Sequence, residues 1–82
     1  MRPTVGRIVH YQTYNTPSGE HPSVPRAAVI TESKFNGGED VMDERNYDVM
    51  VCVLDPTGIF FNKVPYSMKP TPGCWNWPPR DP

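Results

Sequence analysis

Four short stretches of the chain concentrate hydrophobic positions between polar segments, a pattern that is typical of β-strands. The stretches are rich in valine, isoleucine and aromatic residues, which pack well on a pleated surface. They lie at Thr4–Tyr11, Arg26–Glu32, Tyr47–Leu54 and Ile59–Val64. Proline, glycine and short polar residues fill the segments between them, so the pattern predicts short strands joined by loops.

The third stretch is apolar on both faces, because valines alternate with methionine, cysteine and leucine between Val49 and Leu54. Such a strand is typically covered on both sides. The residues that follow, Asp55-Pro56-Thr57-Gly58, place Asp, Pro and Gly where a type I turn favours them. The third and fourth stretches are therefore predicted to form a hairpin.

Three large apolar residues in succession, Ile59, Phe60 and Phe61, begin the second arm of this hairpin. Neighbouring side chains on a strand point to opposite faces, so Phe60 lies on one face and its two neighbours on the other. One face can join the core, which leaves the other for a partner. We expect a homo-oligomer, a dimer, joined through the outer face of the hairpin around Phe60 with Met50 or Cys52 nearby. The alternative is that Phe60 lies under the first loop.

The remaining segments predict loops and little helix. Eleven prolines in 82 residues disfavour long helices. Gln12–Pro25 is a long loop, Ser33–Asn46 is a polar loop around Gly37-Gly38, and a short strand or single 3₁₀ turn is expected at Cys74–Trp77. We predict one all-β domain over residues 1–82, a small Src-homology-3-like or Tudor-type barrel of four to five short strands with long ordered loops. An OB-like barrel is the alternative.

Size and charge narrow the choice of partners. A chain of 82 residues is near the lower limit for a self-sufficient core, so a partner subunit would add useful burial. The formal net charge of −1 gives no overall attraction to nucleic acid or to an anionic membrane. No apolar run approaches the ~20 residues needed to span a bilayer, and the first residues do not resemble a signal peptide. We expect a soluble intracellular protein without membrane or extended nucleic acid as a partner.

Residues that bind metals or act as nucleophiles are few and scattered. His10, His21, Cys52 and Cys74 include no pair with the spacing of metal ligands, such as Cys-x-x-Cys. Cys52 lies in an apolar strand, without the neighbouring base that would activate a nucleophile. We therefore expect no metal, no cofactor, no disulfide and no catalytic residue, and we interpret the chain as a binding protein and not an enzyme.

Aromatic residues offer the best candidate for a ligand site. Two tryptophans near the chain end would share one face of an extended segment, and the long first loop, with the residue just before it, carries two tyrosines and a histidine. Aromatic faces stack on nucleobases, and an Arg guanidinium binds phosphate. The predicted ligand-binding residues are Tyr11, Tyr14, His21, Arg26, Trp75 and Trp77. The alternative is structural: the tryptophans close the bottom of the barrel, and Tyr14 packs over its open end.

Four separated blocks, "PTVGRIVHY", "RAAVITE", "CVLDPTGIFFN" and "PGCWNWPP", resemble a family of small, largely uncharacterised proteins encoded by tailed bacteriophages and prophages. The resemblance implies a phage product that acts in the bacterial cytoplasm or is built into the virion. Two roles are then expected. One is counter-defence, by sequestering a nucleotide-derived immune signal or binding a host protein; the other is an accessory virion or protein-interaction component. The nucleotide role requires a pocket with converging aromatic and Arg groups, whereas the structural role requires a flat apolar patch.

Overall fold

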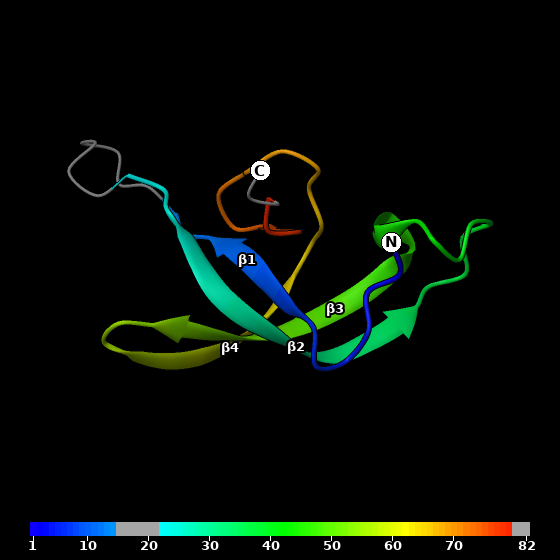
Figure 1. Cartoon of the computed structure of the whole chain (residues 1–82). Helices are drawn as coiled ribbons and strands as arrows, with labels where there is room; N and C mark the ends of the chain where they lie inside the picture. Colours follow the sequence, from blue (N-terminus) through cyan, green and yellow to red (C-terminus); the bar gives the residue numbers. More distant parts are fainter. Residues whose placement is uncertain (15–21, 80–82) are drawn as a thin grey trace.

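Five strands form one antiparallel sheet in the computed structural model, which describes residues 1–14 and 22–79 (Figure 1). The strand order is β4-β3-β2-β1-β5. The strands are β1 (Ile8–Gln12), β2 (Pro25–Phe35), β3 (Tyr47–Asp55), β4 (Gly58–Val64) and β5 (Trp75–Asn76). The only helical element of the described residues is the 3₁₀ turn η1 (Glu44–Asn46). The predicted all-β class is confirmed.

The sheet curls into a barrel-like form. β1 to β4 follow one another as neighbours, and β5 returns to pair with β1. The segment after β4 then approaches β5. There the backbone N–H of Trp75 donates to the Pro65 carbonyl at 2.9 Å, and the backbone N–H of Ser67 donates to the Trp75 carbonyl at 3.0 Å. The two edges of the open sheet are thus linked by a short parallel bridge between Tyr66 and Trp75. This arrangement is consistent with the predicted small Src-homology-3-like barrel.

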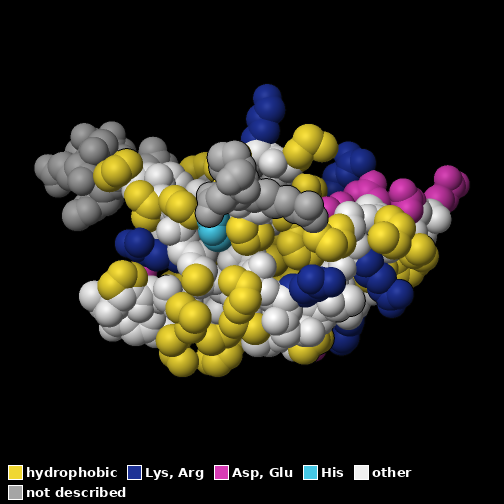
Figure 2. Space-filling model, viewed as in Figure 1, with side chains coloured by type: hydrophobic (Ala, Val, Ile, Leu, Met, Phe, Trp, Pro, Cys, Tyr) yellow, Lys and Arg dark blue, Asp and Glu magenta, His cyan; other side chains and the backbone are white. Residues whose placement is uncertain are grey.

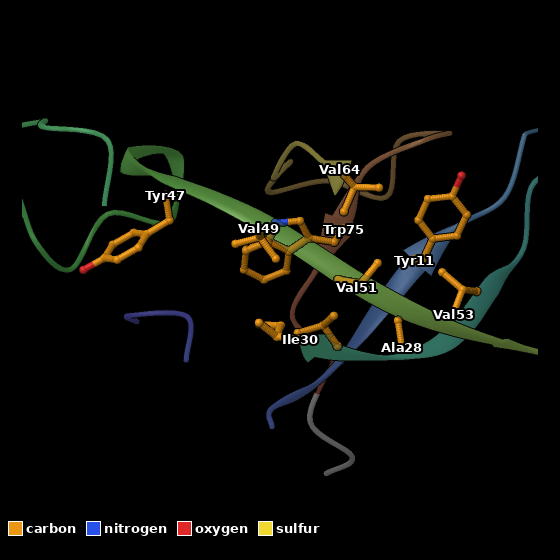
Figure 3. Close-up of a cluster of buried hydrophobic side chains, with 10 residues drawn as sticks. Tyr11, Ala28, Ile30, Tyr47, Val49, Val51, Val53, Val64 and Trp75 are labelled. Carbon is orange, nitrogen blue, oxygen red and sulfur yellow. The ribbon is translucent and has the colours of Figure 1, made fainter. Parts of the chain in front are cut away.

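The core fills the inner face of this curled sheet. Trp75 is fully buried, and Figure 3 shows its indole beside Val49 and Ile30. Every second residue of β3 points inward, so its alternating valines are all buried. The core residues are Val9, Tyr11, Ala28, Ile30, Tyr47, Val49, Val51, Val53, Val64 and Trp75.

The first two strands differ from the sequence-based boundaries. β1 begins at Ile8 and not at Thr4, because Gly6 adopts φ +94° in a turn, where its N–H donates to the Ile30 carbonyl at 2.8 Å. β2 continues to Phe35, beyond the predicted end at Glu32. A bulge between Ile30 and Glu32 shifts the register there, and it keeps later side chains aligned with those of β3.

The predicted hairpin between β3 and β4 is present. Asp55 pairs with Gly58 across the turn, and the Asp55 carboxylate accepts hydrogen bonds from the Thr57 N–H at 3.1 Å and the Thr57 hydroxyl at 3.0 Å. These bonds fix the turn and the register of the hairpin. The segment predicted as a short strand or turn at Cys74–Trp77 contains β5, and the predicted loop Ser33–Asn46 ends in η1.

Candidate interaction surface

The outer face of the sheet carries an unbroken row of apolar side chains across four strands. Phe61 of β4 is paired with Cys52 of β3, Cys52 with Val29 of β2, and Val29 with Ile8 of β1. Paired residues in a sheet point to the same face. Because Val9 and Val53, their chain neighbours, are in the core, this row points outward.

A second row lies beside the first, two residues nearer the β3–β4 turn. It consists of Ile59 on β4, Leu54 on β3, Ala27 on β2 and His10 on β1. Neither row contains a Lys, Arg, Asp or Glu. We call the seven apolar residues of the two rows the apolar patch: Ile8, Ala27, Val29, Cys52, Leu54, Ile59 and Phe61.

The large side chains of the patch are open to solvent. The exposed fractions are 64% for Phe61, 63% for Ile59, 54% for Ile8 and 45% for Leu54. Figure 2 shows hydrophobic side chains gathered at the lower edge of the molecule, where Figure 1 places the β3–β4 hairpin. The patch exposes on the order of 500 Å², which is at the upper end of what a typical monomer leaves uncovered.

Charged residues of both signs border the patch at the end away from the hairpin turn. Met50 on β3 lies between Lys63 on β4 and Glu32 on β2, and Lys34 is paired with Asp48. The Lys34 ammonium lies 3.7 Å from the Glu32 carboxylate. The two lysines and the two carboxylates at this border therefore give it no net charge.

The two faces of the hairpin are the reverse of the prediction. Phe60 points inward, because it is paired with the core residue Val53, and its ring meets Tyr11 edge-on at 5.9 Å between centroids. Ile59 and Phe61 take the outer face instead. Met50 does lie on the outer face, 37% exposed, so the structure places Phe60 and Met50 on opposite sides of the sheet.

Three of the predicted ligand-binding residues form one row on the inner face. Tyr11 is paired with Arg26 on one side and with Trp75 on the other. Tyr11 is 3% exposed and Trp75 is fully buried, so neither offers an open face to a ligand. Burial is the largest cause that raises the pKa of the Tyr11 hydroxyl, and nearby Tyr14 adds to it. The Arg26 Nε lies 3.5 Å from the Asp55 carboxylate.

Two other predicted ligand-binding residues border this row: the Trp77 ring packs edge-on against Trp75, with 5.1 Å between centroids, and Tyr14 lies near Tyr11. Tyr14 is 70% exposed, with its hydroxyl over Gly73. Trp77 is half-buried, and its indole N–H donates to the Glu44 carboxylate. His21 lies outside the described residues. The predicted set therefore does not form a single open site in this structure.

A groove that sequence reasoning missed lies where η1 meets the end of β4. It has a volume of about 490 Å³ and is lined by Arg45, Tyr47, Asp48, Val49, Lys63, Val64, Pro65 and Tyr66. The Tyr66 ring packs edge-on against Trp75, with 4.9 Å between centroids. Burial, followed by the charge of Glu44, raises the pKa of Tyr66. These residues come from separate segments of the sequence, so the groove could not be predicted from a local motif.

Metal sites, disulfides and membrane-spanning helices are all absent from the described parts of the chain. Within residues 1–14 and 22–79, no group of three or more His, Cys, Asp or Glu residues could hold a metal ion. Cys52 and Cys74 are both half-buried free thiols. The same residues contain no helix that is long and apolar enough to cross a membrane.

Comparisons with protein-family models, with curated proteins and with solved structures give no match for this chain. The resemblance of the four sequence blocks to bacteriophage proteins therefore stays a prediction.

Proposed function

We propose that this protein is a binding module, not an enzyme, that binds another polypeptide through its apolar patch. The observation that carries the proposal is the pair of apolar rows across β4, β3, β2 and β1, exposed without one charged side chain. Under the bacteriophage resemblance, such a module would act in the bacterial cytoplasm or as an accessory component of the virion.

A polypeptide suits this surface better than a small molecule. Small ligands bind in concave pockets that enclose most of their surface. The apolar patch lies instead on the outside of a curled sheet, and its centre is apolar while its border is charged. Protein interfaces have this organisation, with few charges at the core and a polar rim.

Site-specific photo-crosslinking in bacterial cells tests the proposal. A photoreactive phenylalanine analogue replaces Phe61 or Ile59 on the patch, and Met68 as the control. Met68 is 82% exposed and lies on the connection between β4 and β5. We expect discrete protein adducts from positions 61 and 59 and none from 68. Adducts from none of them, or the same adducts from all three, would overturn the proposal.

The groove beside Tyr66 favours a second candidate function, the binding of a nucleotide-like signal. Its volume lies in the range of small-ligand pockets. Lys63 could bind phosphate oxygens beside the Asp48 carboxylate, and Tyr66 could contact a base, whereas the Arg45 guanidinium is paired with the Asp43 carboxylate at 2.8 Å. Calorimetric titration with mono- and cyclic dinucleotides tests this function. Lys63→Glu should weaken binding about tenfold or more, while Lys69→Glu on the β4–β5 connection should not.

A further inference from the structure

We infer that the occupant of the apolar patch is a second copy of this chain, with the two sheets packed face to face. The inference rests on the proposed function and names its partner. Two-fold symmetry brings the same patch together on both subunits, so the patch must be complementary to itself in shape and in charge.

The shape of the patch meets this requirement. The outer face of a curled sheet is convex, so two such faces approach most closely at their middle and diverge toward their edges. The middle of the first row holds the short side chains of Cys52 and Val29, both half-buried, and its ends hold the exposed Phe61 and Ile8. Bulky side chains therefore stand where the gap between two copies would be widest.

A two-fold axis parallel to the strands and through the middle of this row satisfies the packing. Phe61 of each copy then faces Ile8 of the other, and Cys52 and Val29 meet at the centre. Sheets packed in this way lie about 10 Å apart, a distance that one layer of side chains from each sheet fills.

The charges at the border also permit a second copy. The two rows contain no Lys, Arg, Asp or Glu, and the border next to them holds Glu32 and Asp48 against Lys34 and Lys63. A border of one sign would repel its own copy, and it would attract a partner of opposite charge. The balanced border does neither.

The area is sufficient for an equilibrium between monomer and dimer. Two patches of this size would together bury about 1,000 Å², which is close to the minimum for a specific interface. We therefore expect association that depends on protein concentration.

Sedimentation equilibrium of the purified full chain tests the inference. The wild type should show the mass of two chains at high micromolar concentration. Phe61→Asp on β4 and Ile8→Asp on β1 should each show the mass of one chain, with a folded near-ultraviolet circular dichroism spectrum. Met68→Asp, the matched control outside the patch, should remain dimeric. In a Cys74→Ala variant, the reaction of Cys52 with a thiol reagent should slow as the protein concentration rises.

Three outcomes would overturn the inference. A wild-type chain that stays monomeric would overturn the inference. If position 61 then forms photo-crosslinked adducts with another protein, the proposed function still holds. A dimer that is lost in Phe61→Asp and kept in Ile8→Asp would indicate pairing through the edge strand β4 in place of the sheet face. A dimer that survives both substitutions would show that another surface joins the copies.

Discussion

At the scale of single residues, neighbours in the chain can have opposite roles. Phe60 and Phe61 are both partly exposed, at 40% and 64%, but only Phe60 contacts the core residue Tyr11. The difference follows from strand geometry alone, because successive side chains leave a strand on opposite faces. It predicts that removal of the two rings has different effects on the folded chain.

Phe60→Ala should lower the free energy of unfolding by roughly 1–3 kcal/mol, because it removes an aromatic contact on the inner face. Phe61→Ala should change it by less than about 0.5 kcal/mol, as expected for an exposed position. Urea unfolding measures both in an Ile8→Asp background, so that self-association through the patch does not contribute. Equal losses would contradict the assigned faces.

Glu44 is a second residue whose neighbours determine its behaviour. Burial alone would raise the pKa of its carboxyl, but hydrogen bonds from the Trp77 indole, from the Glu44 backbone N–H and from the α-ammonium of Met1 together outweigh burial and lower the pKa. A carboxyl with a lowered pKa in the folded state contributes stability above its unfolded pKa of about 4.3. That contribution to stability is lost as the pH falls through the pKa that Glu44 has in the folded state.

Glu44→Gln should therefore destabilise the protein at pH 7 by about 1 kcal/mol, since a neutral amide accepts a weaker hydrogen bond than a carboxylate. The difference from the wild type should shrink below about pH 4 and vanish in more acidic solution. Tryptophan fluorescence during urea unfolding at several pH values measures it. The exposed Glu39→Gln is the control; a pH-independent difference for Glu44→Gln would be inconsistent with the assigned ion pairing.

At the scale of elements, the connection between β4 and β5 is held against the end of β1. The Gly73 N–H donates to the Gln12 carbonyl at 2.7 Å. Gly73 has φ +81°, a backbone conformation that favours glycine, and a Cβ at this position would clash with the Tyr14 hydroxyl. Tyr14 thus lies over the segment that leads into β5.

Gly73→Ala should destabilise the chain slightly more than Gly37→Ala, because a Cβ at position 73 must displace the exposed Tyr14 ring. Gly37 has a similar φ of +96°, but a Cβ at that position would meet nothing within 4 Å, so only the backbone strain of about 1–2 kcal/mol applies there. In a Tyr14→Ala background the steric part of the Gly73→Ala cost should disappear. Thermal unfolding of the two single variants and the double variant measures this coupling. Additive effects of the two substitutions would exclude the contact.

The strands could be predicted from the sequence because their signals are local. Runs of apolar and β-branched residues mark β2 and β3, and Asp55-Pro56-Thr57-Gly58 marks the hairpin turn. The faces of β4 could not be predicted, since large apolar residues occupy both sides of Ile59–Phe61. Which side joins the core is set by the pairing of β4 with β3 and by Trp75, which arrives from the far end of the chain to fill the inner face.

The apolar patch was hidden from sequence reasoning for the same reason. Its four strands are separated by loops, and only the register of all three strand pairs brings Phe61, Cys52, Val29 and Ile8 into one row. The sequence predicted that one face of the hairpin is left for a partner, and that partner stays a prediction. The bulge in β2 was not predictable either, because the strand signal of "RAAVITE" carries no mark of an extra residue.

At the scale of the whole molecule, thermal stability should depend on protein concentration. A partner that binds only the folded state stabilises that state by mass action, and here the partner is a second copy. Once most folded chains are dimeric, a tenfold rise in concentration favours each dimer by about 1.4 kcal/mol, which is about 0.7 kcal/mol for each chain. For a domain of this size, the melting temperature should then rise by roughly 3–5 °C.

Scanning calorimetry of the wild type over a hundredfold range of concentration measures this rise. Phe61→Asp should show a melting temperature that does not change with concentration, because its patch no longer binds a second copy. Met68→Asp should follow the wild type. Repeated scans exclude aggregation, which makes unfolding irreversible and dependent on the scan rate. A constant melting temperature for the wild type would mean that the patch stays uncovered in the purified protein.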